Sequence, residues 1–273
     1  MLTHRVEPGH KVHLGDIDPG DTRGVERADA EARLSALNAE LTDLQEVHYA
    51  AGHNAILIVL QGLDTAGKDG TIKHVMAQFN PAGCRVETFK VPTPEEQAHD
   101  FLWRCHRVTP AQGTITIFNR SHYEDVLVVR VHKLAPKATW EKRYAHINNF
   151  EHLLVDSGTI VLKFFLYISR DEQRRRLIAR EQDTDKAWKL SVSDWSEHAL
   201  YEQYVEAYED ALSQCSTEYA PWYIVPADHK WLRNLAVAQT IVDVMDPYRR
   251  VWREELEQLG RERLAAAKAA GRA

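Results

Sequence analysis

The sequence predicts an α/β fold, a three-layer αβα sandwich around a five-stranded parallel sheet. Short apolar strand candidates alternate with longer helical stretches, and such alternation favours right-handed βαβ units. The apolar run at 56–60 leads directly into a glycine-bracketed loop, as in a nucleotide-type α/β sheet. A composition of 44% hydrophobic and 27% charged residues over 273 residues fits one large globular domain with appendages.

Two segments precede the sheet. Residues 1–24 carry several glycines and prolines among polar residues, which indicates an extended arm. From Val25 to about Tyr49, Leu or Val recurs at every third or fourth position, so this stretch is predicted to be an amphipathic helix. We therefore expect residues 1–50 to form an arm and a helix that pack on the core.

The remaining elements alternate along the chain. The strand candidates are residues 56–60, 85–89, 114–118, 160–168 and 222–225. The helical patterns occupy residues 71–79, 95–107, 137–156, 171–180, 192–215 and 230–245. Residues 247–273 are rich in Glu, Arg, Leu and Ala, which predicts a separate terminal helix that frays toward its end. The main domain is accordingly expected to span residues 51–246.

The loop after the first strand candidate has the spacing of a P-loop. Gly62 and Gly67 bracket four residues and Lys68 follows, so backbone amides can surround phosphate oxygens while the lysine reaches the terminal phosphates. Asp69 stands where such loops usually carry the hydroxyl that ligates magnesium, which makes Asp64 the candidate metal ligand. A glycine-rich turn that merely joins a strand to a helix is the alternative, and the flanking elements make it the weaker one.

A second polar cluster follows the strand candidate at 114–118. Since ligands of parallel sheets bind at the carboxyl ends of strands, Arg120 and the neighbouring carboxylates should face the phosphates at Lys68. Asn119 or Ser121 could instead cap a helix, with the acidic residues in its first turn, and both readings stay open for them. An arginine gains nothing from a helix N-terminus and needs an anion to explain it. The polar residues of this cluster are Asn119, Arg120, Ser121, Tyr123, Glu124 and Asp125.

The densest positive run lies between residues 174 and 189. Arg176 and Arg180 are four apart on one helical face, as suits two guanidiniums that converge on neighbouring phosphates. Arg174 and Arg175 fit a solvent-exposed face better. We expect residues from about 171 to 195 to form a lid that closes over the P-loop and neutralises transition-state charge. Its candidate contributors are Arg180, Lys186 and Lys189.

Together these motifs resemble those of the polyphosphate kinase 2 family over about residues 54–226. The resemblance rests on four segments in the family's order: GLDTAGKDGTIKHV at 62–75, FKVPTPEEQAHDFLWR at 89–104, FNRSHYEDVLVVRV at 118–131 and WKLSVSDW at 188–195. The DGT and SHYED forms look most like the subgroup that phosphorylates both nucleoside mono- and diphosphates. This family's loop lacks the usual hydroxyl, so Asp69 is not an anomaly within it.

The resemblance implies phosphate transfer between polyphosphate and AMP, ADP or ATP, on a P-loop kinase fold with a thymidylate-kinase-like helical lid. It implies Mg²⁺ as the cofactor, with Mn²⁺ as the alternative, held by Asp64 and Asp125. The catalytic residues that it implies are Asp64, Lys68, Arg120, Asp125 and Arg180. The phosphate- and nucleotide-binding residues that it implies are Gly62, Thr65, Ala66, Gly67, Lys68, Asp69, Gly70, Asn119, Ser121, Tyr123, Glu124, Arg130, Lys189 and Asp194.

A polyphosphate chain also requires a row of cations along its path. Candidates near the second and third strands are Lys90, Arg104, Arg107, Lys133 and Lys137. The formal net charge of −6 argues against a general nucleic-acid binder. If these cations gather on one side, the surface is polarised despite the negative net charge.

Two other functions stay open. An ATP-dependent nucleoside or nucleotide kinase would use the same fold with a different donor, and a non-catalytic phosphate-binding module would hold its ligand without turnover. The three cysteines form no CxxC pair, so neither a disulfide framework nor a zinc site is indicated. The N-terminal region lacks an apolar signal segment and the apolar runs are too short to cross a bilayer. We expect a cytoplasmic homo-oligomer without nucleic-acid or membrane partners.

Overall fold

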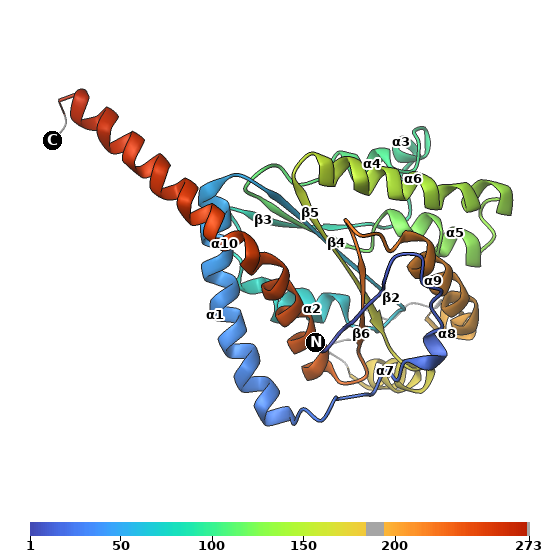
Figure 1. Cartoon of the computed structure of the whole chain (residues 1–273). Coiled ribbons are helices and arrows are strands. Elements are labelled where there is room, and N and C mark those ends of the chain that lie inside the picture. The colour runs from blue at the N-terminus through green and yellow to red at the C-terminus, as the bar shows by residue number, and fades with distance from the viewer. Residues whose placement is uncertain (184–193, 272–273) are drawn as a thin grey trace.

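A computed structural model describes residues 1–183 and 194–271, and a six-stranded sheet forms its centre (Figure 1). The strand order is β1-β6-β5-β2-β4-β3. The five predicted strands are all present and run parallel to one another: β2 (Ala55–Gly62), β3 (Cys84–Thr88), β4 (Ile115–Asn119), β5 (Thr159–Tyr167) and β6 (Trp222–Pro226). The α/β prediction with a parallel sheet is confirmed.

The sixth strand, β1 (His4–Arg5), comes from the N-terminal arm and pairs antiparallel with β6. The pairing continues into the next residue: the Val6 amide donates to the Trp222 carbonyl at 2.9 Å. The arm then passes through a short 3₁₀ helix, η1 (Leu14–Asp16), in which Leu14 is fully buried. The predicted count of five strands is therefore one too low, because a two-residue strand is too short to show the alternation that reveals strands in a sequence.

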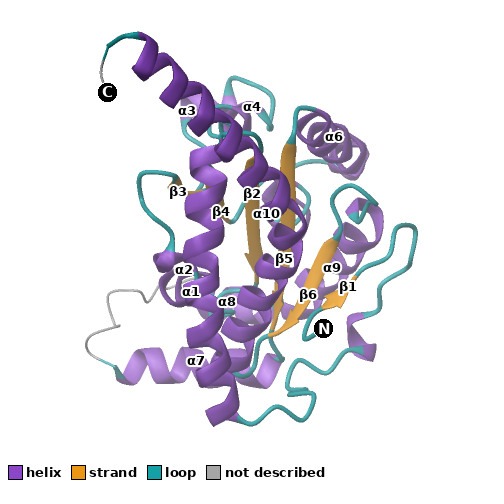
Figure 2. Cartoon of the chain, turned by 60° about the vertical axis from the view of Figure 1, so that its left-hand side comes forward, coloured by secondary structure: helices purple, strands orange, loops and turns teal. Residues whose placement is uncertain are grey.

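Helices cover both faces of the sheet, which gives the predicted three layers (Figure 2). Ile56, Ile58 and Leu60 of β2 pack in one core with α1 (Arg27–Ala51) and α10 (Lys230–Ala269), and α2 (Lys68–His74) lies on the same side. Leu57 and Val59 pack in the other core with α6 (Lys137–Asp156) and α9 (Tyr201–Cys215). The division follows from strand geometry, since successive side chains point to opposite faces.

Two predicted helices are interrupted. The stretch 95–107 forms α3 (Pro94–Gln97) and α4 (Trp103–His106), because the Asp100 carboxylate accepts the Leu102 amide at 2.9 Å and makes a turn between them. The stretch 192–215 contains α8 (Asp194–Ala199) and α9, which Leu200 separates. The remaining short elements are η2 (Met76–Gln78), η3 (His122–Asp125), α5 (Val128–Val131) and α7 (Arg170–Gln182).

The C-terminal prediction of two helices on either side of Pro247 is wrong, because α10 runs through this proline without ending. Contacts with α1 hold the helix beyond it: Arg249 pairs with Glu40 at 2.7 Å and with Asp43 at 3.2 Å. Trp252 is fully buried, and its indole N–H donates to the Asn54 side chain at 2.9 Å. The last turns of α10 extend beyond the body of the protein (Figure 1).

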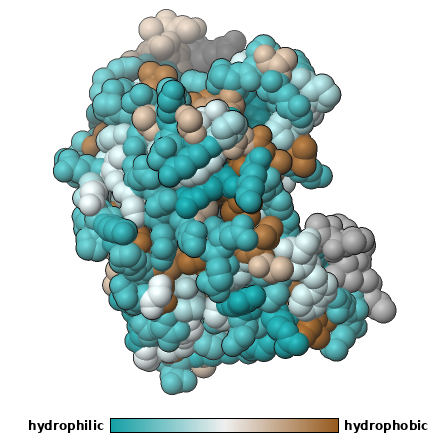
Figure 3. All heavy atoms as spheres, turned by 90° about the vertical axis from the view of Figure 1, so that its right-hand side faces the viewer, coloured by the Kyte–Doolittle hydropathy of each residue, from teal (hydrophilic) through white to brown (hydrophobic). Residues whose placement is uncertain are grey.

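On the face shown in Figure 3, apolar side chains lie in small separate groups among mainly hydrophilic ones. In the described part of the chain no helix is long and apolar enough to cross a membrane. The three cysteines are free thiols, and Cys105 and Cys215 are buried. A functional site is therefore expected at the carboxyl ends of the parallel strands.

Candidate active site

The P-loop occupies the expected place at the carboxyl end of a central strand. β2 ends at Gly62 and α2 begins at Lys68, so the intervening loop lies where parallel sheets bind their ligands. Gly67 has φ 105° and Thr65 has φ 65°, both in the left-handed region. For Thr65 this conformation costs about 1–2 kcal/mol, so the surrounding contacts must hold it in place.

Lys68 folds back over its own loop. Its ammonium group donates to the Gly62 carbonyl at 2.7 Å and to the Leu63 carbonyl at 3.3 Å. Burial disfavours the charged form, and the nearby Arg120 guanidinium adds to this effect, so the pKa of Lys68 falls to about 8. A phosphate oxygen would be a stronger partner for the ammonium than these two carbonyl groups, because both partners would then be charged.

Arg120 joins the loop to the end of β4. Its guanidinium lies 2.8 Å from Asp64 and 3.2 Å from Glu124, and it is 37% exposed. The other Glu124 oxygen accepts a hydrogen bond from Gln61 at 3.0 Å. Arg120 itself has φ 62°, the second non-glycine residue of the site in the left-handed region. The structure thus brings Asp64, Arg120 and Glu124 together as the strand-end argument predicts.

The structure gives the Asn119 and Ser121 side chains different roles. The Asn119 amide donates to the Asp69 carboxylate at 2.9 Å, so it links β4 to the first turn of α2. Ser121 is fully buried, and its hydroxyl accepts the Tyr123 amide at 3.1 Å. Ser121 therefore caps η3, as the structural alternative predicts.

The prediction of Tyr123 as a binding residue is contradicted by the position of its side chain, which is fully buried in the core. Its hydroxyl donates to Glu151 at 2.8 Å and accepts from Lys163 at 2.9 Å. The 3₁₀ turn at 122–125 directs neighbouring side chains to different sides, so the sequence segment as a whole cannot be assigned to the site.

Asp125 is also engaged elsewhere. Arg143 donates to its carboxylate at 2.8 Å and to its carbonyl at 2.9 Å, and Arg104 lies 3.8 Å from its other oxygen. Burial raises the pKa of Asp125, although these two arginines oppose that effect. Since its oxygens are held by arginines, the structure gives no support to Asp125 as a metal ligand.

The predicted lid residues are only partly described. Lys186 and Lys189 lie outside the described residues. Arg180 at the end of α7 pairs with Asp194 at the start of α8 at 3.1 Å. The same helix reaches the P-loop through Gln173, whose amide donates to the Asp64 carbonyl at 3.2 Å.

The predicted polyphosphate cations have different surroundings. Lys90, Lys133 and Lys137 are exposed, and the last of these lies 3.9 Å from Glu141 on its own helix. Arg104 is buried and donates to the Lys90 carbonyl at 2.9 Å. Arg107 stacks on Trp103. Arg130, which was predicted to bind phosphate or nucleotide, pairs with Asp210. The path of the polyphosphate chain beyond the P-loop therefore remains a prediction.

A cavity of about 280 Å³ opens beside the P-loop. From the predicted set it is lined by Gly62, Asp64, Arg120 and Glu124. Sequence reasoning missed the residues opposite them, of which the most notable are His132, Gln173, Glu197, Tyr204 and Tyr208. Their only local signal is the spacing of three and four between the tyrosines at 201, 204 and 208, which a buried helix face explains equally well.

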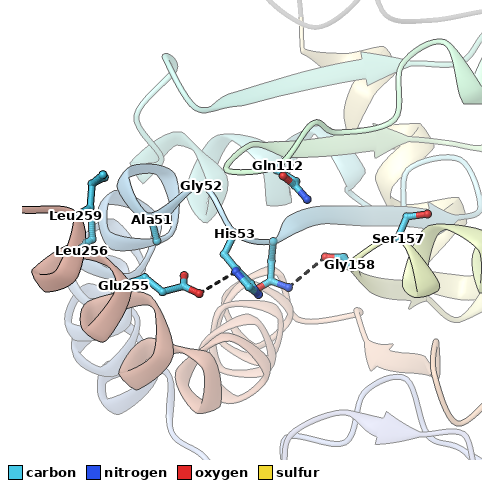
Figure 4. A pocket seen from close by; sticks show the side chains of 10 residues that line it. Ala51, Gly52, His53, Gln112, Ser157, Gly158, Glu255, Leu256 and Leu259 are labelled. Atoms are coloured by element: carbon cyan, nitrogen blue, oxygen red, sulfur yellow. Dashed lines mark hydrogen bonds and ion pairs between the residues drawn. The ribbon is translucent and has the colours of Figure 1, made fainter. Parts of the chain in front are cut away.

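A second cavity, of about 410 Å³, lies at the opposite end of the sheet and contains none of the predicted site residues. Figure 4 shows His53 and Glu255 pointing toward each other there, with 2.8 Å between the ring nitrogen and the carboxylate. This cavity lies at the amino ends of the strands, whereas parallel sheets bind substrates at the carboxyl ends. We therefore assign the chemistry to the smaller cavity.

The carboxylates of that cavity suit a hard divalent cation. Among the described residues there is no group of three or more His, Cys, Asp and Glu side chains that could hold a metal. Mg²⁺ commonly uses one or two carboxylates together with substrate phosphates. Asp64, at the edge of the cavity and 31% exposed, can supply such a ligand.

The family profile of polyphosphate kinase 2 matches residues 24–251, which include α1, the P-loop, the β4 segment and the first half of α10. The chain belongs to the polyphosphate kinase 2 family. It is 49% identical to an AMP/ADP-polyphosphate phosphotransferase from Meiothermus ruber, over 90% of this chain and 93% of that protein. It is 43% identical to an ADP-polyphosphate phosphotransferase from Rhodopseudomonas palustris, over 89% and 88% of the two chains.

The solved structures agree with this membership. The crystal structure of polyphosphate kinase 2 from Arthrobacter aurescens TC1 superposes with a TM-score of 0.86 at 44% identity, and the match covers 89% of this chain and 88% of that one. The structural likeness thus extends over most of the chain and is not confined to one motif.

Proposed function

We propose that this protein transfers the terminal phosphate of inorganic polyphosphate to ADP, giving ATP, and to AMP, giving ADP. The observation that carries the proposal is that the Asp64–Arg120–Glu124 cluster lines one cavity together with Gly62 and Leu63, whose carbonyls bind the Lys68 ammonium. Membership of the polyphosphate kinase 2 family supports polyphosphate as the donor. The relative from Meiothermus ruber supports both acceptors.

In the proposed reaction the donor's terminal phosphates lie on the P-loop and the acceptor lies in the adjoining cavity. A terminal phosphate oxygen of ADP or AMP attacks the terminal phosphorus of polyphosphate, and the bond from that phosphorus to the bridging oxygen breaks. The shortened polyphosphate leaves with the electron pair of that bond. Lys68 and Arg120 hold the transferred group in line and offset its charge, which is the main demand of phosphoryl transfer.

The acceptor end of the cavity suits a nucleotide. Arg120 provides a cation for its phosphates, while Tyr204 and Tyr208 provide aromatic surface in the same cavity. We propose that Arg180, Lys189 and Asp194 contribute from the lid. Asp64 would hold Mg²⁺, or Mn²⁺ in its place, and that ion would supply positive charge to offset the charge of the phosphates.

The test is the choice of donor by the purified protein. With Mg²⁺ and ADP, ATP should form when long-chain polyphosphate is supplied and not when it is omitted. AMP with polyphosphate should give ADP and then ATP. Phosphorylation of a nucleotide or nucleoside by ATP, without any reaction of polyphosphate, would favour the conventional kinase instead. Size-exclusion chromatography with light scattering would test the homo-oligomer that we also propose.

A further inference from the structure

Two buried arginines hold the P-loop from behind. Arg176 of α7 donates to the Thr65 carbonyl at 2.9 Å and to the Ala66 carbonyl at 3.2 Å. The rest of its guanidinium binds the backbone after β6 and the carboxylate of Glu172, at 2.6 Å. All three nitrogens of Arg176 thus have partners, and one of these partners is a carboxylate.

Arg233 of α10 reaches the same carbonyl but lacks such a partner. Its guanidinium donates to the Ala66 carbonyl at 3.2 Å and to the Asn234 side chain at 2.8 Å. It is 2% exposed, and among the described residues no carboxylate pairs with it. Burial and the neighbouring Arg176 lower the pKa of Arg233 to about 10, which leaves it charged at neutral pH.

The glycines of the motif make room for this guanidinium. A Cβ on Gly67 would overlap the Arg233 side chain, and a Cβ on Gly70 would lie 2.9 Å from its Nη2 atom. The close approach therefore depends on glycine at both positions. Arg233 belongs to the architecture of the loop although 165 positions of sequence separate it from Lys68.

The contact also orients a peptide group. In a trans peptide the carbonyl and the N–H point in opposite directions, so an arginine that binds the Ala66 carbonyl directs the Gly67 amide to the other side of the loop. A buried cation without a counter-charge is costly, by several kcal/mol for an isolated ion. An anion bound on the far side of the loop would reduce this cost.

We propose that Arg233 is a positioning residue for the phosphate donor: it fixes the 66–67 peptide and places a positive charge beneath the bound anion without touching it. The inference rests on the proposed function only in that the loop is taken to bind the donor. It assigns to α10 a part in donor binding that neither the motif nor the cavity lining indicates.

The test compares Arg233→Met and Arg233→Lys with Arg250→Met, an arginine of the same helix whose side chain is 79% exposed. Titration calorimetry with inorganic tripolyphosphate gives the Kd, and steady-state assays give kcat and the KM values for polyphosphate and ADP. Arg233→Met should raise the Kd and the polyphosphate KM about tenfold, with kcat and the ADP KM within about threefold. Arg233→Lys should recover part of the loss, because it keeps the charge, and Arg250→Met should behave as wild type.

Melting temperatures separate positioning from plain stability. Without ligand, Arg233→Met should melt no lower than wild type, because it removes a buried unpaired charge, and it should gain less from tripolyphosphate. A variant that binds tripolyphosphate as wild type does, or whose only change is a lower melting temperature, would overturn the role of Arg233. If Arg233→Met does not fold, Arg233→Lys decides by the same criteria. Wild-type protein that does not bind tripolyphosphate would contradict the proposed function itself and remove the premise.

Discussion

Two ion clusters of the protein differ in their access to solvent. Arg120 sits between Asp64 and Glu124 and is 37% exposed beside a cavity. Lys163 sits between Glu151, at 2.5 Å, and the Tyr123 hydroxyl, and both ions of this pair have fully buried side chains. The same segment, residues 119–125, contributes to both clusters. A ligand can reach the first and cannot reach the second, so we assign chemistry to the open cluster and stability to the sealed one.

The sealed cluster shows why a polar side chain in a motif need not be catalytic. His122 lies 3.2 Å from Glu151, and burial lowers its pKa below the usual value. Lys163 also donates to the Cys215 carbonyl at 2.6 Å, so the cluster ties β5 to the end of α9. Charges buried in this way are costly unless every partner is present, which makes the cluster sensitive to single substitutions.

The largest effect is expected at the open site. Lys68→Ala should reduce the turnover of polyphosphate with ADP by about three orders of magnitude, because the ammonium that binds the transferred phosphate is lost. The urea midpoint should change little. Lys73→Ala, an exposed lysine on the same helix, is the control and should keep its activity. Near-normal turnover by Lys68→Ala would refute the assignment of the P-loop as the donor site.

At the sealed cluster the expected loss is one of stability. Glu151→Gln leaves Lys163 as an uncompensated buried charge and should lower the free energy of unfolding by about 3–5 kcal/mol, measured by urea titration. The exposed pair Lys137–Glu141 is the matched comparison, and Glu141→Gln should cost less than about 1 kcal/mol. Equal losses in the two variants would show that burial does not separate the clusters.

A smaller effect should distinguish the two aspartates that were predicted to hold the metal. Asp64→Asn should raise the Mg²⁺ concentration for half-maximal rate about tenfold, since a neutral amide is a weaker ligand. Asp125→Asn should leave the Mg²⁺ dependence unchanged, because arginines occupy that carboxylate. A rate and Mg²⁺ dependence unchanged by Asp64→Asn would make Asp64 a residue that only shapes the loop.

The smallest expected effect is on pH dependence. The folded pKa of Lys68, about 8, lies below the unfolded value of about 10.4, so the unfolded chain binds more protons between these values. From this group alone, the free energy of unfolding should rise with pH in that window, while donor binding weakens as the ammonium loses its proton. We expect kcat/KM for polyphosphate to fall by about half between neutral pH and pH 8 and to decline further above it. Lys68→Arg should lose this decline, because its guanidinium stays charged; an identical decline would point to another group.

Local pattern predicted most of the fold because the strands β2, β4, β5 and β6 are buried on both faces and the loop spacing is a short-range feature. The meeting of Arg120 with Asp64 was also predictable, since both residues follow neighbouring parallel strands. The strand β1 and the continuity of α10 through Pro247 were not, because pairing with β6 and packing on α1 decide them. Both depend on contacts between distant parts of the chain.

The same limit applies to the site. Nothing local separates Tyr123, which enters the core, from Glu124, which faces the cavity, because the turn that divides them forms only in the folded structure. Arg233 reaches the P-loop from α10, and Tyr204 and Tyr208 approach it from α9. Their spacing is that of an ordinary buried helix face, so sequence alone could not assign them to the site.

The contrast between the clusters is tested most directly by measuring the ATP formed per folded molecule by Arg120→Met and by Lys163→Met, with ADP, polyphosphate and Mg²⁺, beside their unfolding free energies. Arg120→Met should lose at least about two orders of magnitude in turnover, with a free energy of unfolding within about 1 kcal/mol of wild type. Lys163→Met should be less stable than wild type, because it leaves Glu151 as a buried charge without its cation, and it should retain its turnover per folded molecule. Wild-type turnover by folded Arg120→Met would contradict the account.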